Sequence, residues 1–241
     1  MTGSRLIVAF SGGKDSTAMA LRLSEMDIPF VLLFTATGNE LPPVHDHIAR
    51  VVRETNCELV LPENRSLGEW IDFYNALPNW RMRWCTRQIK IEPAIAYLVA
   101  NPGSTLAVGL RADEPERAGL YGEFATYRYP LREWGWDIHR VRDYCSRRGF
   151  TPPARTDCAV CPYQRLSEWF HLWRDHRAYF EQGVAWEAAT GHTFRSPGRD
   201  SWPAPLAELA ELFENGRIPK GEANGLLFDD DDPVACRVCR A

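Results

Sequence analysis

The sequence predicts an α/β protein built on a mainly parallel sheet with helices on both faces. Its first half alternates short apolar runs with longer stretches of helical periodicity. The apolar runs are continuous instead of alternating with polar residues, which is typical of strands buried on both faces. Strands that alternate with helices along the chain favour parallel pairing, because each parallel crossover needs a long connection.

The strands are expected at five apolar segments. They cover residues 6–10, 30–35, 58–61, 105–110 and, as a short fifth strand, 127–131. Helical periodicity appears between them, over residues 17–23, 43–55 and 91–98. Pro93 should begin or kink the last of these helices, because proline lacks the amide that an interior turn requires. Ligands of such sheets bind at the carboxyl ends of the strands, so the loops that follow the strands should meet on one edge.

The second half of the chain has a different character. From about Trp134 onward, helical segments, aromatic residues and the first C-x₂-C pair appear. Helices are expected over residues 136–148 and around residues 206–213. We therefore predict an α/β domain over residues 1–133 and a helical, cysteine-containing region over residues 134–241.

Composition narrows the classes of function. The 241 residues carry a net charge of −4, so general electrostatic attraction to nucleic acid or to an anionic membrane is not expected. No segment reaches transmembrane length and no signal-peptide pattern begins the sequence, so the expectation is a cytoplasmic protein without a membrane partner. Seven cysteines are too few for a disulfide scaffold of this length, and their clustering indicates metal or redox chemistry.

The segment behind the first strand is the most specific motif. It consists of Ser11, Gly12, Gly13, Lys14, Asp15 and Ser16. The two glycines let several backbone N–H groups face one point, and the helix that follows adds partial positive charge. The serines add hydroxyl donors, Lys14 adds a cation, and Asp15 is a candidate ligand for Mg²⁺. The motif predicts a phosphate-binding loop; an ordinary glycine turn that caps a helix is the alternative.

This loop resembles the pyrophosphate loop (PP-loop) of the ATP pyrophosphatase, or adenine nucleotide alpha-hydrolase, superfamily. It is not a Walker loop, because Val8 and Asp15 stand where that motif needs glycine and a hydroxyl residue. The resemblance implies a Rossmann-like sheet of the HUP type. It also implies that ATP binds with its β- and γ-phosphates in the loop and is cleaved between the α- and β-phosphates.

The loop after the second strand is a candidate for recognising adenosine. Thr35, Thr37 and Gly38 offer hydroxyl groups and an open backbone at a strand end. The superfamily resemblance implies that they contact the nucleoside. The alternative is a loop that caps the following helix.

The loop after the fourth strand resembles the Gly-x-Arg-x-x-Glu segment of the phosphoadenosine phosphosulfate reductase branch of the superfamily. The matching residues are Gly109, Arg111 and Glu114. The guanidinium of Arg111 suits a phosphate, and Glu114 or Asp113 suits Mg²⁺. A salt-bridged exposed loop is the alternative interpretation.

The cysteines include two C-x₂-C pairs, Cys158/Cys161 and Cys236/Cys239. The first pair is followed by proline, a pattern found where a turn holds two thiolates on a metal or cluster. Cys85, in a basic segment, resembles the upstream cysteine that joins this pair on a [4Fe–4S] cluster in the reductase-like branch. The resemblance implies Cys85, Cys158 and Cys161 as ligands.

The fourth cluster ligand is open. Cys239 is the first candidate, with Cys236 beside it, Cys145 or a site with three protein ligands as alternatives. A structural zinc site built from both pairs competes with the iron–sulfur interpretation, although the pairs lie far apart for a compact zinc ribbon. Cys57 is expected to be a small buried apolar residue.

Two basic stretches contain or adjoin these cysteines. Trp80 and Trp84 alternate with Arg81, Arg83 and Arg87, and further arginines lie between residues 140 and 155. Arginine with indole is suited to the backbone and unpaired bases of RNA or DNA. Neutralisation of thiolates or binding of a nucleotide phosphate explains the arginines equally well.

The predicted function is ATP cleavage with adenylation and pyrophosphate release, with Lys14, Asp15 and Arg111 as catalytic residues. It is coupled to iron–sulfur-dependent transfer of sulfur from a donor to a nucleic-acid or nucleotide acceptor. Reductases of the resembled branch have a degenerate loop without the lysine, whereas this loop is intact. The alternatives are a sulfonucleotide reductase that uses Cys239 or Cys236, and a nucleotide- and metal-dependent interaction module; a homodimer is compatible with each.

Overall fold

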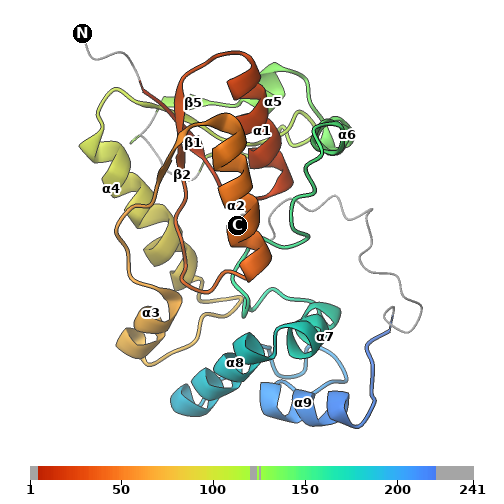
Figure 1. The fold of residues 1–241 in the computed structure, drawn as a ribbon. Coiled ribbons are helices and arrows are strands. Elements are labelled where there is room, and N and C mark those ends of the chain that lie inside the picture. Colours follow the sequence, from red (N-terminus) through yellow and green to blue (C-terminus); the bar gives the residue numbers. More distant parts are fainter. Residues whose placement is uncertain (1–4, 120–123, 125, 221–241) are drawn as a thin grey trace. The chain divides into compact units, whose positions relative to one another are not determined.

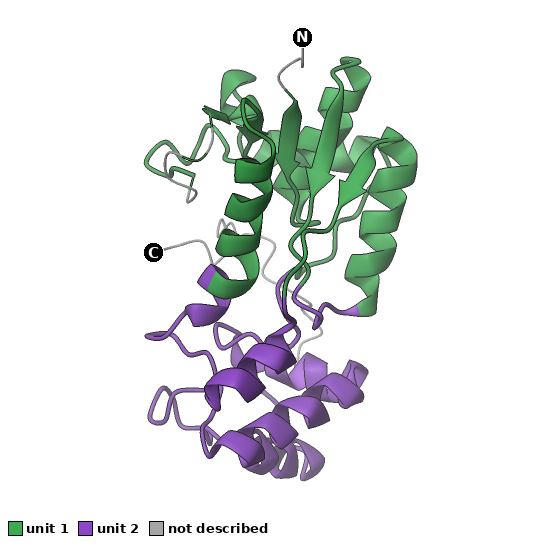
Figure 2. Cartoon of the chain, turned by 90° about the vertical axis from the view of Figure 1, so that its left-hand side faces the viewer, with its two compact units in different colours: residues 1–36, 42–64, 88–156 green, residues 37–41, 65–87, 157–241 purple. Residues whose placement is uncertain are grey.

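The computed structural model describes residues 5–119, 124 and 126–220. The chain forms two compact units (Figure 2). The first comprises residues 1–36, 42–64 and 88–156, and the second comprises residues 37–41, 65–87 and 157–241. The units differ from the predicted domains, because short segments of the first half join the second unit and residues 134–156 join the first.

The first unit contains a parallel sheet of five described strands (Figure 1). The strands are β1 (Leu6–Ala9), β2 (Phe30–Leu33), β3 (Glu58–Val60), β4 (Thr105–Ala107) and β5 (Thr126–Arg128). Their order is β3-β2-β1-β4-β5, and each neighbouring pair is parallel. The predicted Rossmann-like α/β fold is confirmed. The chain runs from β1 outward to β2 and β3 and then crosses back to β4 on the other side of β1, so the strand order reverses beside β1. Ligands of open α/β sheets bind at such a point.

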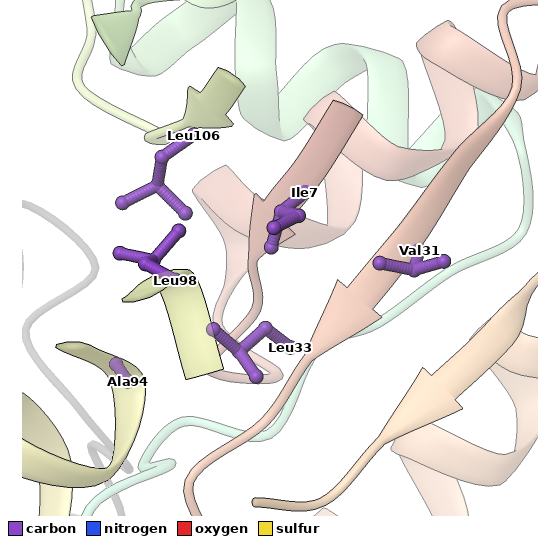
Figure 3. Close-up of a cluster of buried hydrophobic side chains, with 6 residues drawn as sticks. All are labelled: Ile7, Val31, Leu33, Ala94, Leu98 and Leu106. Atoms are coloured by element: carbon purple, nitrogen blue, oxygen red, sulfur yellow. The ribbon is translucent and has the colours of Figure 1, made fainter. Parts of the chain in front are cut away.

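Helices cover both faces of this sheet. They are α1 (Lys14–Glu25), α2 (Pro42–Thr55), α4 (Glu92–Ala100), α5 (Pro130–Glu133) and α6 (Ile138–Arg147). One face packs on α4 through a buried cluster of Ile7, Val31, Leu33, Ala94, Leu98 and Leu106 (Figure 3). On the opposite face, where Val8 is fully buried, α1 packs against β1 with Met19 and Leu23 inside. Side-chain alternation along a strand produces these two layers.

Long-range contacts explain why α6 belongs to the first unit. It packs on α1. Arg148, directly after α6, pairs with Glu25 at the end of α1 and with Glu54 in α2, the latter at 2.8 Å. Three segments that lie far apart in the sequence are thereby joined on one side of the sheet.

The second unit is helical. Its helices are α3 (Leu67–Tyr74), α7 (Leu166–Asp175), α8 (Arg177–Thr190) and α9 (Leu206–Glu214). Trp169 is fully buried against the rings of Phe180 and Phe194. Glu187 accepts hydrogen bonds from the backbone N–H groups of Phe194 and Leu206 at 2.9 and 2.6 Å, and burial raises its pKa to about 7.

A π-helix, η1 (Thr86–Ile91), follows Cys85 and runs directly into α4. Pro93 lies in the first turn of α4. The helix start near Pro93 was predictable, whereas the π-helical geometry was not. Such turns are rare and often accompany functional sites. None of the described helices is long and apolar enough to cross a membrane.

Candidate functional site

The predicted phosphate loop forms the turn between β1 and α1. Gly12 has φ 73°, in the left-handed region that favours glycine, and α1 begins at Lys14 with Gly13 as its N-cap. Hydrogen bonds of its own serines stabilise the loop. Ser16 Oγ donates to the carbonyl of Gly13 at 3.1 Å and accepts from the backbone N–H of Ser11 at 3.3 Å. No side chain caps the start of α1, so its first backbone N–H groups present an anion-binding end.

The Asp15 carboxylate lies between two cations. Its Oδ2 is 3.1 Å from Arg111 Nη1 and 3.9 Å from Lys14 Nζ. Burial raises the pKa of Asp15, although the charges of Lys14 and Arg111 oppose the rise. Its Oδ1 is buried and has no hydrogen-bond partner among the described residues. One carboxylate oxygen therefore remains available to a further ligand.

The Arg111 side chain is only 1% exposed and is surrounded by carboxylates. Its Nε and Nη2 donate to the two oxygens of Asp113 at 2.9 and 3.2 Å, and its Nη1 lies 3.5 Å from Glu114. Burial raises the pKa of Asp113, but the hydrogen bonds and charge of Arg111 outweigh this and hold it below its usual range. The guanidinium that we predicted to face a phosphate is thus occupied in joining the β4 loop to Asp15.

Arg132, in α5, fixes the β4 loop from its other side. Its guanidinium donates to three backbone carbonyls, those of Arg111 at 3.3 Å, Arg117 at 2.7 Å and Glu114. Arg117 in turn pairs with Glu114 at 2.5 Å. Sequence analysis did not identify Arg132, because its partners are carbonyl groups 15 to 21 residues away and leave no side-chain signature.

Gly109 is the point at which the β4 loop touches the phosphate loop. A Cβ at this position would lie 3.3 Å from the backbone of both Asp15 and Ser16, closer than most Cβ contacts in proteins. The glycine therefore allows the end of β4 to pass against the start of α1.

Replacing Gly109 with alanine should push these backbones apart. We expect a loss of about 1–3 kcal/mol in stability and a larger fractional loss of nucleotide affinity, because the phosphate loop shifts. Gly103→Ala is the matched control. Gly103 has φ 78° with no atom within 4 Å of an added Cβ, so alanine there should lower the melting temperature and leave nucleotide affinity unchanged. Equal affinity losses in both variants, measured by calorimetric titration, would contradict this role for Gly109.

Two buried side chains that the sequence did not assign to the loop support it. Cys145, in α6, directs its Sγ to the Lys14 carbonyl at 3.7 Å. Burial and the charge of Asp15 raise the pKa of its thiol to about 12. His47, in α2, lies with Nε2 2.8 Å from Thr17 Oγ1, and burial lowers its pKa to about 4. Both are neutral near pH 7, and Cys145 is accordingly a poor candidate for a cluster thiolate.

The segment predicted to bind adenosine is divided between the units. Thr35 follows β2 and is half-buried in the first unit, whereas Thr37 and Gly38 belong to the second. The backbone N–H and Oγ1 of Thr37 both donate to Glu40, at 2.7 and 2.6 Å. Gly38 has φ 71°, and a Cβ there would lie 2.8 Å from that of Ser66. The adenosine contact stays a prediction.

Asn39, from the same segment, holds the first C-x₂-C turn. Its carbonyl accepts from the backbone N–H of Ala159 at 2.8 Å, and its side-chain oxygen accepts from that of Val160 at 3.3 Å. The two residues between Cys158 and Cys161 are therefore anchored by a residue about 120 positions earlier. This scaffolding role was not visible in the sequence.

Cys85, Cys158 and Cys161 all lie in the second unit. Burial raises the pKa of Tyr163; the charge of Arg83 opposes the rise, and the charges of Cys161 and Cys85 add to it. Tyr163 also donates to the Trp80 carbonyl at 3.2 Å. Among the described residues, no three His, Cys, Asp or Glu side chains are grouped to hold a metal ion. Cys236 and Cys239 lie outside the described residues, so the cluster ligands stay predictions.

The two other cysteines among the described residues belong to the first unit. Cys145 is in the first unit, beneath the phosphate loop, as described above. Cys57, next to β3, is half-buried instead of fully buried, and its Sγ lies 2.9 Å from Thr55 Oγ1. Burial raises the pKa of its thiol.

Residues 5–121 match the family described as phosphoadenosine phosphosulfate reductase domain. This segment belongs to that family of PP-loop proteins. The match spans the phosphate loop, β1 to β4 and the loop after β4. The chain thus carries the nucleotide-binding domain of an enzyme family.

Further similarities are more distant. An uncharacterised protein of Methanocaldococcus jannaschii is 23% identical, over 86% of this chain and 54% of its own length, so the chain spans about half of that relative. A phosphoadenylyl-sulfate reductase from Candida auris, in a phosphate complex, is 17% identical with a TM-score of 0.49, over 63% of this chain and 76% of its own. A predicted tRNA methyltransferase subunit from Methanocaldococcus jannaschii is 17% identical with a TM-score of 0.34, over 62% and 90%.

Proposed function

We propose that the chain binds ATP and cleaves it between the α- and β-phosphates, transferring AMP to an acceptor and releasing pyrophosphate. The observation that carries this proposal is the complete loop. It combines Gly12 in the left-handed region, an α1 start without a side-chain cap, and Lys14 beside them. Backbone N–H groups and an ammonium group that are already aimed at one point stabilise the charge that develops on a leaving pyrophosphate.

Asp15 fits a Mg²⁺ ion, because its Oδ1 is buried without a partner among the described residues. Mg²⁺ usually takes one or two carboxylates together with phosphate oxygens and water. When bound, the ion neutralises phosphate charge. Arg111 is a positioning residue in this proposal, since it holds the other oxygen of Asp15 at 3.1 Å.

In the proposed reaction, an acceptor oxygen attacks the α-phosphorus while the bond to the β-phosphate oxygen breaks. Pyrophosphate takes the electron pair of that bond, and Lys14 and the loop amides balance its new charge. A sulfur nucleophile at the oxidation level of sulfide then displaces AMP from the adenylated acceptor. The acceptor ends with sulfur in place of oxygen.

We propose that Cys85, Cys158 and Cys161, which all lie in the second unit, hold a thiolate-bound cofactor. The turn between Cys158 and Cys161 is anchored by Asn39. We propose a [4Fe–4S] cluster at this place, with Cys239 as fourth ligand and zinc as the competing metal. When bound, the cluster supplies a site at which sulfur can be held. The cysteines themselves must be deprotonated to hold it.

Changing Cys158 or Cys161 to serine should therefore remove iron from anaerobically purified protein, because a hydroxyl group replaces a thiolate poorly. Iron and acid-labile sulfide should fall together, while ATP affinity changes little. Cys57→Ser is the matched control and should keep the full metal content. Wild-type protein that carries zinc and no iron would contradict the cluster and leave the proposed sulfur transfer without its cofactor.

A second candidate function is reduction of a sulfonucleotide, which the match to the phosphoadenosine phosphosulfate reductase domain favours. The intact loop with Lys14 favours ATP instead, because a sulfonucleotide has no pyrophosphate leaving group. The test is to supply each substrate to the same anaerobic protein. Pyrophosphate from ATP without sulfite from phosphoadenosine phosphosulfate supports the first function, whereas sulfite release with no ATP turnover supports the second.

A further inference from the structure

An exposed aromatic surface lies on the second unit, on the segment between residues 65 and 87. We call it the aromatic shelf and define it by the rings of Trp70, Phe73, Tyr74 and Trp84. Phe73 is 63% exposed and Tyr74 39%. Trp70 and Trp84 are half-buried, so Phe73 and Tyr74 form the exposed part of the shelf. Adjoining exposed rings need an explanation, because isolated apolar side chains are ordinary on a protein surface but clusters usually bind something.

Ring contacts join the shelf into one surface. The rings of Trp70 and Tyr74, one turn apart on α3, are stacked at 5.3 Å and 16°. Phe73 meets both rings edge-on, at 5.5 and 5.1 Å. Tyr74 contacts Trp84 at 5.2 Å, which links α3 to the residue immediately before Cys85. The shelf therefore ends beside a predicted cluster ligand.

Arginines accompany these rings. The guanidinium of Arg65 lies over Trp70 and Phe73, at 5.2 and 5.1 Å from their centres. A turn at Asn79 precedes Trp84 by five residues. Trp80 in this turn is 54% exposed, and the guanidinium of Arg81 lies over its ring, 4.6 Å from the ring centre. Planar cations on aromatic faces add electrostatic attraction to stacking.

Charge in this segment has the opposite sign to that of the whole chain. Residues 65–87 carry four arginine side chains and two acidic ones, whereas the chain has a net charge of −4. One of the acids, Glu69, has its carboxylate engaged by the N–H and hydroxyl of Ser66 in the capping box of α3. A partner that offers flat rings and negative charge together is complementary to this surface.

We propose that the aromatic shelf, with Trp80 and Arg81, binds the unpaired bases and the phosphates of a single-stranded nucleic acid. Bases stack on aromatic faces regardless of sequence, and arginines follow the phosphate backbone. The inference rests on the proposed function and deepens it, because it gives the adenylated and sulfur-accepting molecule a chemical class. Placement of Trp84 before Cys85 would bring a bound base toward the predicted cluster.

The test measures binding of the full chain to labelled 20-mers of single-stranded RNA and DNA by fluorescence anisotropy. Changing Phe73 and Trp80 together to alanine should weaken binding by about tenfold for each stacking ring lost. Phe73→Tyr with Trp80→Phe should restore it, since a ring remains at each place. Both residues are exposed, so the variants should keep their melting temperature. A duplex of the same sequence should bind more weakly, because its bases are already stacked.

Matched controls separate stacking from general apolar contact. Met82 is 53% exposed in the same turn, and Val99 is 59% exposed on α4. Neither has an aromatic face, so alanine at either should leave affinity for the single strand unchanged. A loss with Met82→Ala equal to that of the double variant would overturn the proposal in favour of an apolar protein-docking surface.

Two further measurements complete the test: the salt dependence of binding and the release of pyrophosphate. Changing Arg65 and Arg81 to glutamine should reduce the slope of log affinity against log salt by about 0.7 for each phosphate contact removed. Stronger binding of RNA than of DNA identifies RNA, and equal binding means that the 2′-hydroxyl is not read. If the wild-type protein binds neither single-stranded RNA nor single-stranded DNA at low salt, the proposal that the aromatic shelf binds nucleic acid is wrong. Pyrophosphate release from ATP without nucleic acid, measured on the same samples, tests the proposed function separately.

Discussion

Replacing Lys14 with alanine should lower pyrophosphate release from ATP by about two orders of magnitude or more. Lys14 supplies the mobile cation of the phosphate loop, and its Nζ lies 3.9 Å from Asp15 at the start of α1. One donor to developing charge is worth about 2–4 kcal/mol in comparable sites, which sets the expected loss of rate. Steady-state release, measured with a coupled phosphate assay after pyrophosphatase, gives the result.

The fold of this variant should survive, because the Lys14 side chain is part-exposed and makes few packing contacts. Lys220→Ala, a change to an exposed lysine in the second unit, is the control and should keep full activity. Lys14→Arg should retain part of the rate, since the charge remains with a different shape. Undiminished pyrophosphate release in Lys14→Ala would show that this loop is not the catalytic cradle.

Replacing Arg111 with methionine should have the largest effect on stability. The change leaves Asp15, Asp113 and Glu114 close together without the buried cation that joins them. Breaking a buried ion pair costs about 3–5 kcal/mol, and the solvent exposure of Asp113 reduces this to about 2–4 kcal/mol here. For a chain of this length, we expect the melting temperature to fall by roughly 10 °C. Differential scanning calorimetry measures it.

The pH dependence of this loss distinguishes charge from packing. A carboxyl whose pKa is raised in the folded state favours folding at low pH, and that contribution is lost as the pH rises through the folded pKa. Burial already raises the pKa of Asp15, and removal of Arg111 should raise it further. The destabilisation should therefore be greatest near pH 7 and shrink toward pH 4. A loss that is equal at both pH values would mean that Arg111 acts only by filling space.

The fold was predictable from the sequence because its signals are local. β1, β2 and β4 lie in continuous apolar runs, and the helices between β1 and β2, between β2 and β3 and between β3 and β4 favour parallel pairing. The division into units was not predictable in the same way. It depends on single contacts between distant residues, such as Asn39 with Val160 and Arg148 with Glu54, whose residue types are ordinary for surface positions.

Within the candidate site too, local features could be predicted from the sequence and long-range contacts could not. The turn between β1 and α1 could be predicted, since the glycines that follow an apolar run and precede a helical pattern mark it, and its binding of phosphate stays a prediction. The surroundings of this turn could not be predicted, because Arg132 acts on backbone carbonyls and Cys145 reaches the Lys14 carbonyl from a helix about 130 residues away. Arg111 shows how far the contacts of a charged residue can be predicted from the sequence. The sequence indicated Asp113 and Glu114 as Mg²⁺ ligands or as part of a salt-bridged exposed loop, but not that Arg111 is buried and pairs with Asp15.

Phosphorus NMR of the products formed from ATP and Mg²⁺ tests the central claim most directly. Incubation of the anaerobically purified full chain, with and without single-stranded RNA or DNA, should yield AMP or an adenylated acceptor together with pyrophosphate. The Lys14→Ala protein should yield neither within the same time. ADP with inorganic phosphate as the products would contradict the account, because it places the cleaved bond between the β- and γ-phosphates.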